Sequence, residues 1–373
     1  MIKSRFKLDI GLVIILLLVM IISVITIHYS TSILPNYMNN LALKQIMWYM
    51  IGFVFILLIM YLSNDFIIKN IWYIYCFGII TLILLLLFAE PINNAKCWFS
   101  LPGIGTIQPS EFMKIILIIM LASMIEKFRI QKPKASVKDE FIFLIKVMFI
   151  VFIPSILTFL QPDTGVVLIY LLITLVMLFI SGIRYRWFII LISILLLFVG
   201  SVIIVYFINT NLFVKIFGTD FFLRIDRLLD WSSSTGFQLE SGKSAIGSGG
   251  LFGNLKVPVY FPEAGTDFIF AVYSSTFGFI GSIILLSLIT YFDLKLINIA
   301  LKSKKQINKY IIAGIVGMLI YQQLQNIGMT FGLMPITGIT LPFISYGGSS
   351  LLSYMIMIGI VFNISNDNLR YKN

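Results

Sequence analysis

Charged residues are scarce in this sequence. Asp, Glu, Lys and Arg make up 12% of the 373 residues, whereas hydrophobic residues make up 59%. A soluble domain carries about 25% charged residues, because its surface faces water. The composition therefore excludes an ordinary soluble domain and predicts that lipid covers most of the surface.

Cysteine and histidine are nearly missing as well. Cys76 lies in an apolar run, Cys97 in a polar stretch, and His28 is the only histidine. This pattern excludes a disulfide framework and a Cys-rich metal site. The net charge of +11 does not indicate a nucleic acid partner, because the basic residues form short clusters between apolar runs. We expect no nucleic acid and no dedicated metal site.

Long apolar runs dominate the rest of the chain. A hydrocarbon core of about 30 Å is crossed by roughly 20 apolar residues in a helix, and helices satisfy their own backbone groups in lipid. The sequence predicts an all-α, polytopic membrane protein, one domain over 1–373, with ten transmembrane helices near 10–28, 45–62, 71–89, 109–125, 141–160, 164–182, 186–208, 267–290, 310–332 and 345–364.

The basic residues predict the topology. Eighteen of the 27 Lys and Arg fall in the two terminal segments and alternate loops, which we place in the cytoplasm by the positive-inside rule. Both termini are then cytoplasmic, which requires an even number of spans. A large extracytoplasmic segment, 209–266, lies between the seventh and eighth helices.

Two aspartates stand at predicted membrane boundaries. Asp267 precedes the run Phe268–Phe270, and Asp163 lies in QPDTG between two spans. A partly desolvated carboxylate has a raised pKa and can act as a general base. The alternative for each is a helix N-cap, a position that Asp favours. From the residues alone, the cap is the simpler interpretation of both.

Charged pairs offer candidate substrate contacts. Glu111 and Lys114 lie three apart on one helix face, so they can form an ion pair. An intramembrane lysine facing a cavity could instead hold a phosphate, and we favour that function. Arg224 and Arg227 suit a diphosphate, or they neutralise nearby aspartates. The Gly-rich stretch SAIGSGGLFG lacks the Lys-Ser/Thr of a P-loop, so we expect a segment lying on the membrane or a tight turn.

Several motifs occur together in a fixed order. They are AKCWFSLPGIGTIQPSEFMKI, QPDTG, SAIGSGGLFG, PEAGTDFIFAV and NIGMTFGLMPITGITLPFISYGGSS. In this order they resemble the SEDS family (shape, elongation, division and sporulation) of bacterial RodA, FtsW and SpoVE proteins, with RodA the most similar branch. Each motif is weak alone, but five in order are specific.

The resemblance implies a peptidoglycan glycosyltransferase of the bacterial plasma membrane that polymerises lipid II and works with a class B penicillin-binding protein. It implies that Asp267 is the catalytic aspartate that deprotonates the acceptor's 4-hydroxyl, which reverses the preference for a cap. The expected substrate contacts are Lys96, Trp98, Glu111, Lys114, Asp163 and Arg224. A divalent cation, Mg or Mn, would help neutralise the leaving diphosphate.

Three departures from the family pattern involve four residues. Cys97 replaces an arginine, Gly265 replaces a histidine, and Ser275 with Thr276 replaces an acidic pair. Two further functions stay open, the first because intramembrane charge in a cavity also suits a transporter, and the second because the acidic pair is missing. One is a lipid II flippase, which would move lipid without lengthening it. The other is a non-catalytic scaffold of the cell-wall machinery.

Overall fold

The computed structural model describes residues 8–31, 40–91, 95–101, 105–219, 221–222, 236–255 and 260–370. The helices are α1 (Ile10–Thr31), α2 (Leu41–Leu62), α3 (Asn64–Lys69), α4 (Ile71–Phe88), α5 (Pro109–Gln131), α6 (Val137–Leu160), α7 (Thr164–Ile180), α8 (Arg186–Ile208), α9 (Thr210–Phe217), α11 (Gly236–Ser248), α12 (Ile269–Lys302), α13 (Gln306–Thr330) and α14 (Gly348–Arg370).

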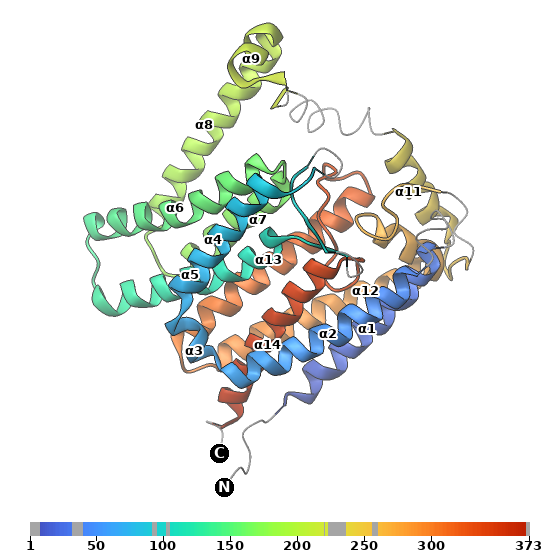
Figure 1. Cartoon of the computed structure of the whole chain (residues 1–373), viewed down its shortest axis with the longest axis horizontal. Helices are drawn as coiled ribbons and strands as arrows, with labels where there is room; N and C mark the ends of the chain where they lie inside the picture. The colour runs from blue at the N-terminus through green and yellow to red at the C-terminus, as the bar shows by residue number, and fades with distance from the viewer. Residues whose placement is uncertain are drawn as a thin grey trace.

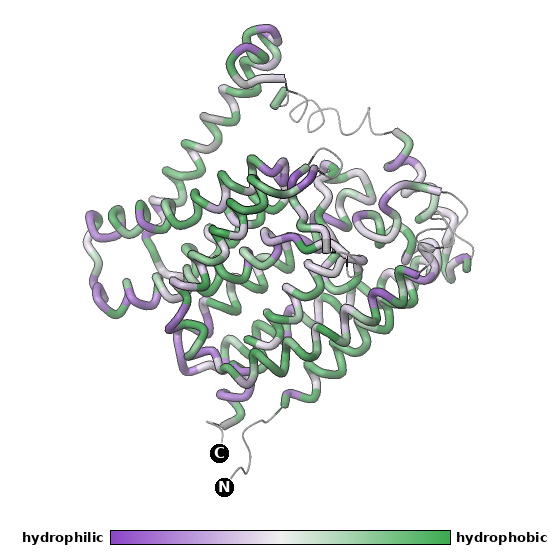
Figure 2. Tube along the Cα trace, in the orientation of Figure 1, coloured by the Kyte–Doolittle hydropathy of each residue, from purple (hydrophilic) through white to green (hydrophobic). Residues whose placement is uncertain are grey.

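Each of the ten predicted spans coincides with a long helix (Figure 1). Seven helices are long and apolar enough to cross a membrane, namely α1, α2, α4, α6, α8, α12 and α14, and α7 is a shorter apolar helix. Figure 2 shows hydrophobic residues along most of the helices and hydrophilic residues concentrated toward helix ends and loops. The all-α membrane fold is confirmed, whereas the count of ten spans and the cytoplasmic termini stay predictions.

Two of the predicted spans, α5 and α13, are less apolar because they lie inside the bundle. α5 packs against α4, α7 and α13, and α13 packs against α5, α7 and α12. Both helices carry buried polar side chains: Ser110, Glu111 and Lys114 on α5, and Gln322, Gln323, Gln325 and Asn326 on α13. A helix surrounded by protein can hold polar groups that lipid would exclude, provided that they find partners.

One contiguous apolar core runs through the bundle, with buried residues from α1 to α14. A second, smaller cluster lies beneath α11 and includes Leu239, Phe261, Phe268 and Met329. The prediction of a single domain over 1–373 stays a prediction.

A short β-hairpin, which the sequence did not predict, precedes α5. β1 (Phe99–Leu101) pairs antiparallel with β2 (Gly105–Ile107), with Ser100 opposite Thr106. Three-residue strands leave no periodicity to detect. The hairpin leads directly into Pro109, which begins α5 at a position where a missing backbone N–H costs nothing.

Helix α12 is interrupted near its start. Gly278 has φ 67° and ψ −165°, which is not helical. The 24 residues that follow it span about 36 Å at the rise of an α-helix, so this part alone is long enough to cross a bilayer. The preceding turns, Ile269–Phe277, form a separate half-helix whose first residue lies two positions after Asp267.

Candidate active site

Asp267 lies on a tight loop immediately before α12. Within this loop, the backbone N–H groups of Thr266 and Phe268 both donate to the carbonyl oxygen of Glu263, at 3.2 and 3.0 Å. The Thr266 hydroxyl donates to the Glu263 carboxylate at 2.6 Å. Phe268 is buried in the cluster beneath α11. The turn is thus closed by its own hydrogen bonds and anchored by an apolar side chain beside the carboxylate.

The segment between α13 and α14 holds this loop from the other side. Ser345 donates its hydroxyl to the Thr266 carbonyl at 2.6 Å, and the Tyr346 N–H donates to the Gly265 carbonyl at 2.9 Å. Asn326 on α13 donates to the carbonyls of Asp267 and Ile339, both at 2.8 Å. The backbone of Asp267 is therefore fixed by groups distant in sequence, while its side chain is left available.

The structure does not use Asp267 as a helix cap. α12 begins at Ile269, and its N-cap is Phe268, which makes no side-chain capping bond. Among the described residues, none donates a hydrogen bond to the Asp267 carboxylate, which is partly exposed. The cap interpretation of this residue is wrong, because among the described residues no backbone N–H of the first turn of α12 donates to its carboxylate.

The environment raises the pKa of Asp267. Burial, which disfavours the charged form of the carboxyl group, is the larger cause. The negative charge of Glu263 is the smaller cause, and together they raise the pKa of Asp267 to about 7. A carboxylate with this pKa is a far better proton acceptor than an ordinary aspartate, and it is still substantially ionised at neutral pH.

Asp163 does serve as a cap, at the start of α7. Its Oδ1 accepts from the Val166 N–H at 3.1 Å. Its Oδ2 accepts from Gln108 Nε2 at 2.7 Å and from the Ser110 hydroxyl at 3.3 Å. Burial, as the largest cause, raises the pKa of Asp163 to about 6. The carboxylate therefore ties the start of α7 to the β-hairpin and α5, and its contact with substrate stays a prediction.

Glu111 and Lys114 form the ion pair that the sequence offered as an alternative. The Lys114 ammonium lies 2.7 Å from Glu111 and is fully buried. It also lies 5.4 Å from the ring centre of Tyr354 on α14, whose hydroxyl accepts from Gln322 at 2.9 Å. Lys114 thus sits in a closed polar network that joins α5, α13 and α14. Direct contact with a diphosphate requires this network to open, and it stays a prediction.

The first outer motif is held close to Asp163. Lys96 donates to the Leu86 carbonyl at 3.4 Å, and Trp98 is partly exposed just before β1. Cys97 is buried, and its thiol donates to the Gln161 carbonyl at 2.7 Å. Burial first, and Asp163 second, raise the pKa of Cys97 to about 12. The thiol at this position is therefore neutral and acts as a packing group.

The other departures also have defined surroundings. Gly265 is buried, and its carbonyl accepts from Tyr346. Ser275 is buried 3.2 Å from the hydroxyl of Ser248, and Thr276 bonds the backbone of its own helix. Arg224 and Arg227 lie outside the described residues.

One segment brings the two aspartate regions together. The Thr337 carbonyl lies so close to the start of α7 that a Cβ added at Gly165 would approach it to 2.9 Å. At the next residue, a Cβ added to Gly338 would lie 3.6 Å from Asp267 Oδ2. The Thr337–Gly338 dipeptide therefore bridges Asp267 and the helix that Asp163 caps.

Sequence reasoning missed the residues that hold the Asp267 loop, namely Asn326, Ser345 and Tyr346. The signal for Asn326 was present, because the polar run QQLQN interrupts an otherwise apolar span. Buried amides need partners, and Asn326 finds its partners in the Asp267 loop. The Asn326 Oδ1 and Thr337 Oγ1 atoms are buried without a hydrogen-bond partner.

The described residues contain no group of three His, Cys, Asp or Glu side chains placed to hold a metal ion. They do not fit a protein-bound cation, so no step is derived through one. The divalent ion suggested by the resemblance stays a prediction.

Comparison with known proteins assigns the chain to a family. The family model described as cell cycle protein, which covers FtsW, RodA and SpoVE, matches residues 6–370. Stage V sporulation protein E of Bacillus subtilis is 32% identical over 96% of both chains. The probable peptidoglycan glycosyltransferase FtsW of Lactococcus lactis is 32% identical over 75% of this chain and 71% of its own.

Solved structures agree over nearly the whole length. A chain of a peptidoglycan synthase complex that coordinates polymerization and crosslinking superimposes with a TM-score of 0.82 and 27% identity, covering 98% of this chain and 99% of that chain. The rod shape determining protein RodA of Thermus thermophilus superimposes with a TM-score of 0.70 and 26% identity, covering 98% of each. This chain therefore belongs to the FtsW/RodA/SpoVE family of cell cycle proteins, the SEDS family.

Proposed function

We propose that this protein is a peptidoglycan glycosyltransferase that polymerises lipid II into glycan strands in the bacterial plasma membrane. The single observation that carries the proposal is the placement of Asp267. Its backbone is fixed by Asn326, its carboxylate has no hydrogen-bonding partner among the described residues, and its pKa is raised to about 7. The naming of related FtsW proteins as probable peptidoglycan glycosyltransferases supports it.

In the proposed reaction, Asp267 accepts the proton of the acceptor sugar's 4-hydroxyl. The resulting oxygen nucleophile attacks the anomeric carbon of the growing chain. The bond from that carbon to the lipid diphosphate breaks, and the diphosphate leaves with the electron pair. A base of pKa about 7 accepts the proton at neutral pH and releases it to water afterwards.

The charges of the leaving diphosphate require cations nearby. Lys96 and Lys114 are the candidates within the described residues, and Arg224 is the candidate outside them. Lys96 is partly exposed and makes a single long bond to a carbonyl, so it can turn toward a ligand at little cost. Lys114 would act by electrostatic attraction from within its network unless that network opens.

A class B penicillin-binding protein is the proposed partner. The similar chain in a peptidoglycan synthase complex, which coordinates polymerization with crosslinking, supports this pairing. Relatives named for sporulation, division and rod shape all match this chain. The proposed process is therefore cell-wall synthesis during elongation, with division or sporulation as the alternatives.

The test is polymerisation of purified lipid II, followed on gels with and without the cognate transpeptidase. Asp267→Asn keeps the shape of the side chain but removes the base, and we expect a loss of about 100-fold or more. Asp65→Asn is the matched control, because Asp65 is exposed and pairs with Lys305 outside the site. Full polymerisation by Asp267→Asn would refute the role. Transport of labelled lipid II without lengthening would favour a flippase instead.

A further inference from the structure

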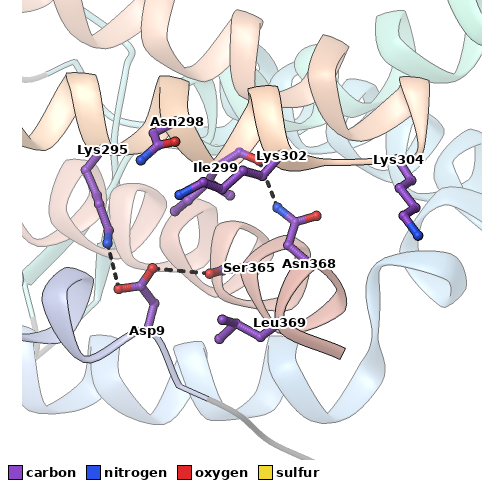
Figure 3. Close-up of a pocket in the computed structure, with 9 residues that line it drawn as sticks. All are labelled: Asp9, Lys295, Asn298, Ile299, Lys302, Lys304, Ser365, Asn368 and Leu369. Carbon is purple, nitrogen blue, oxygen red and sulfur yellow. Dashed lines mark hydrogen bonds and ion pairs between the residues drawn. The ribbon is translucent and has the colours of Figure 1, made fainter. Parts of the chain in front are cut away.

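A small pocket lined by several polar and charged side chains lies near the end of α12, and Figure 3 shows its lining. α12 runs from the Asp267 loop at its start to this pocket at its end. The pocket has a volume of about 170 Å³. Its polar lining includes Asp9, Lys295, Lys302, Lys304, Ser365 and Asn368. None of these residues belongs to the site described above.

The only acidic group in the lining is already neutralised. Asp9 Oδ1 lies 3.0 Å from the Lys295 ammonium, and Asp9 Oδ2 accepts from the Ser365 hydroxyl at 3.4 Å. Figure 3 shows the Lys295 side chain reaching from α12 to Asp9, with Ser365 and Asn368 on the opposing helix. Lys302 is exposed and forms no ion pair with any residue that the structure describes. Within the described part of the chain, the pocket therefore keeps a positive charge without a counter-ion.

The free donors suit a tetrahedral anion. Lys302 offers an ammonium with three donors, and Asn298, which also lines the pocket, offers an exposed amide. Asn368 is held by its bond to the Ile299 carbonyl at 2.8 Å, which fixes α14 against α12. This bond holds the end of α14 beside the α12 residues that line the pocket.

The face of α12 beside the pocket is apolar and exposed. Leu294, Ile297 and Leu301 are 57%, 37% and 75% exposed. Their spacing of three and four residues places them along one side of the helix. A free inorganic anion would gain nothing from contact with such an apolar face, whereas the acyl chains of a lipid would cover it.

We propose that this pocket binds the phosphate of an anionic phospholipid, with Lys302 as the main cation and the acyl chains along Leu294, Ile297 and Leu301. Basic pockets between membrane helices are suited to anionic headgroups, because the charge attraction adds to the apolar contact. The lipid would join the ends of α12 and α14 to the start of α1.

The test uses the full-length protein purified in detergent and titrated with phosphatidylglycerol, with retained lipid counted by native mass spectrometry. We expect Lys302→Gln to bind phosphatidylglycerol about fivefold more weakly, since one lysine near an anionic lipid contributes about that factor. Lys302→Arg should restore binding. Lys134→Gln, an equally exposed lysine on the α5–α6 loop, should leave binding unchanged. Phosphatidylcholine should be retained weakly by every variant.

Three results would overturn the assignment. The first is equal retention by the wild type and Lys302→Gln. The second is an equal loss in Lys134→Gln, which would mean that binding depends only on overall charge. The third comes from adding inorganic phosphate to the lipid-loaded protein. Displacement of phosphatidylglycerol by an equal concentration of phosphate would assign the pocket to the free anion.

Discussion

At the scale of single residues, the proposed base is adjusted by its neighbour. The negative charge of Glu263 is the second cause, after burial, of the raised pKa of Asp267. A general base works only when deprotonated, so we expect the polymerisation rate to rise with pH and level off above about 7, with roughly a tenfold fall per pH unit below it.

The variant Glu263→Gln tests this dependence. Removing the charge lowers the pKa of Asp267, so the acid limb of the pH–rate profile should move to lower pH. The glutamine can still accept from Thr266, which preserves the turn. Glu240→Gln, at an exposed site on α11, should leave the profile in place. A profile that does not move in Glu263→Gln would show that the rate does not report the ionisation of Asp267.

Asn326 is the residue that positions Asp267. In Asn326→Ala the carbonyls of Asp267 and Ile339 both lose their donor, and a buried unpaired group costs about 1–3 kcal/mol. We expect a lower melting temperature and at least about tenfold slower polymerisation, because small displacements of a reacting group are costly.

Asn308→Ala is the matched control for Asn326→Ala. Asn308 is also buried on α13 and also donates through its amide, to Ser303 at 3.0 Å, but it lies at the other end of the helix. Its loss should lower stability and leave kcat near that of the wild type. Equal losses of activity in the two variants would mean that Asn326 acts on stability alone.

Residue identity pointed to Asp267 as the proposed base, but it did not predict the residues that hold its loop. Asp267 was selected by its place at a membrane boundary and by its motif. Ser345 and Thr266 are 79 residues apart, yet they share a hydrogen bond. Periodicity and local motifs describe contacts within a few turns of a helix, so this pairing was outside their reach.

At the scale of elements, the Gly-rich stretch forms a turn that hydrogen-bonds to the break in α12. We call this turn, residues 249–253, the clasp. After α11 ends, the carbonyls of Gly250 and Leu251 accept from the N–H groups of Phe279 and Ile280, at 2.9 and 3.1 Å. The break at Gly278 exposes these donors, and the turn satisfies them. The expected tight turn is present, and its hydrogen bonds hold α12 at the end of the half-helix that follows Asp267.

Glycine is required where these backbones meet. Gly253 and Gly278 have φ of 93° and 67°, and an added Cβ at Gly278 would lie 2.6 Å from the Leu251 carbonyl. We expect Gly253→Ala and Gly278→Ala each to destabilise the protein by about 2 kcal/mol or more. Gly247→Ala should be neutral or stabilising by up to about 1 kcal/mol, because Gly247 is helical with open space around it. Thermal unfolding in detergent measures all three, and similar melting temperatures would refute the clasp.

Helix type was predictable from the sequence, whereas helix ends were less so. Apolar runs of about 20 residues can only be helices in lipid, and the ten predicted runs are helical. α12 continues to Lys302, beyond the predicted end at 290. The last turns of α12 carry lysines, and the composition of this stretch had suggested a loop. Lysine is nevertheless a good helix former, and its long side chain can extend the charge into water.

At the scale of the whole molecule, the bundle has two chemically different ends. One end carries the Asp267 loop, the β-hairpin and α11, and the other carries the ends of α12 and α14, together with the lysines at the end of α12 and directly after it (Figure 1). The positive-inside rule places the lysine end in the cytoplasm. The proposed polymerisation at Asp267 would then take place on the outer side of the membrane.

This orientation can be measured with single cysteines. In a Cys76→Ser background, which leaves only the buried Cys97, Lys243→Cys and Lys134→Cys place thiols on exposed positions at opposite ends. A membrane-impermeant maleimide should label position 243 in intact cells and position 134 only after permeabilisation. The Cys76→Ser chain alone gives the background.

The opposite pattern would place Asp267 in the cytosol. A base there could not reach an acceptor strand outside the membrane. The polymerase proposal would then fail, whatever the pKa of the Asp267 carboxyl group. Labelling of both positions from outside would require an even number of spans between them, whereas the ten-helix topology places three there, so this result would refute that topology instead. The proposed catalysis thus requires that the bundle be inserted with its lysine end inward. Only then would the raised pKa of Asp267, its hydrogen bond from Asn326 and the clasp beside Gly278 contribute to the reaction.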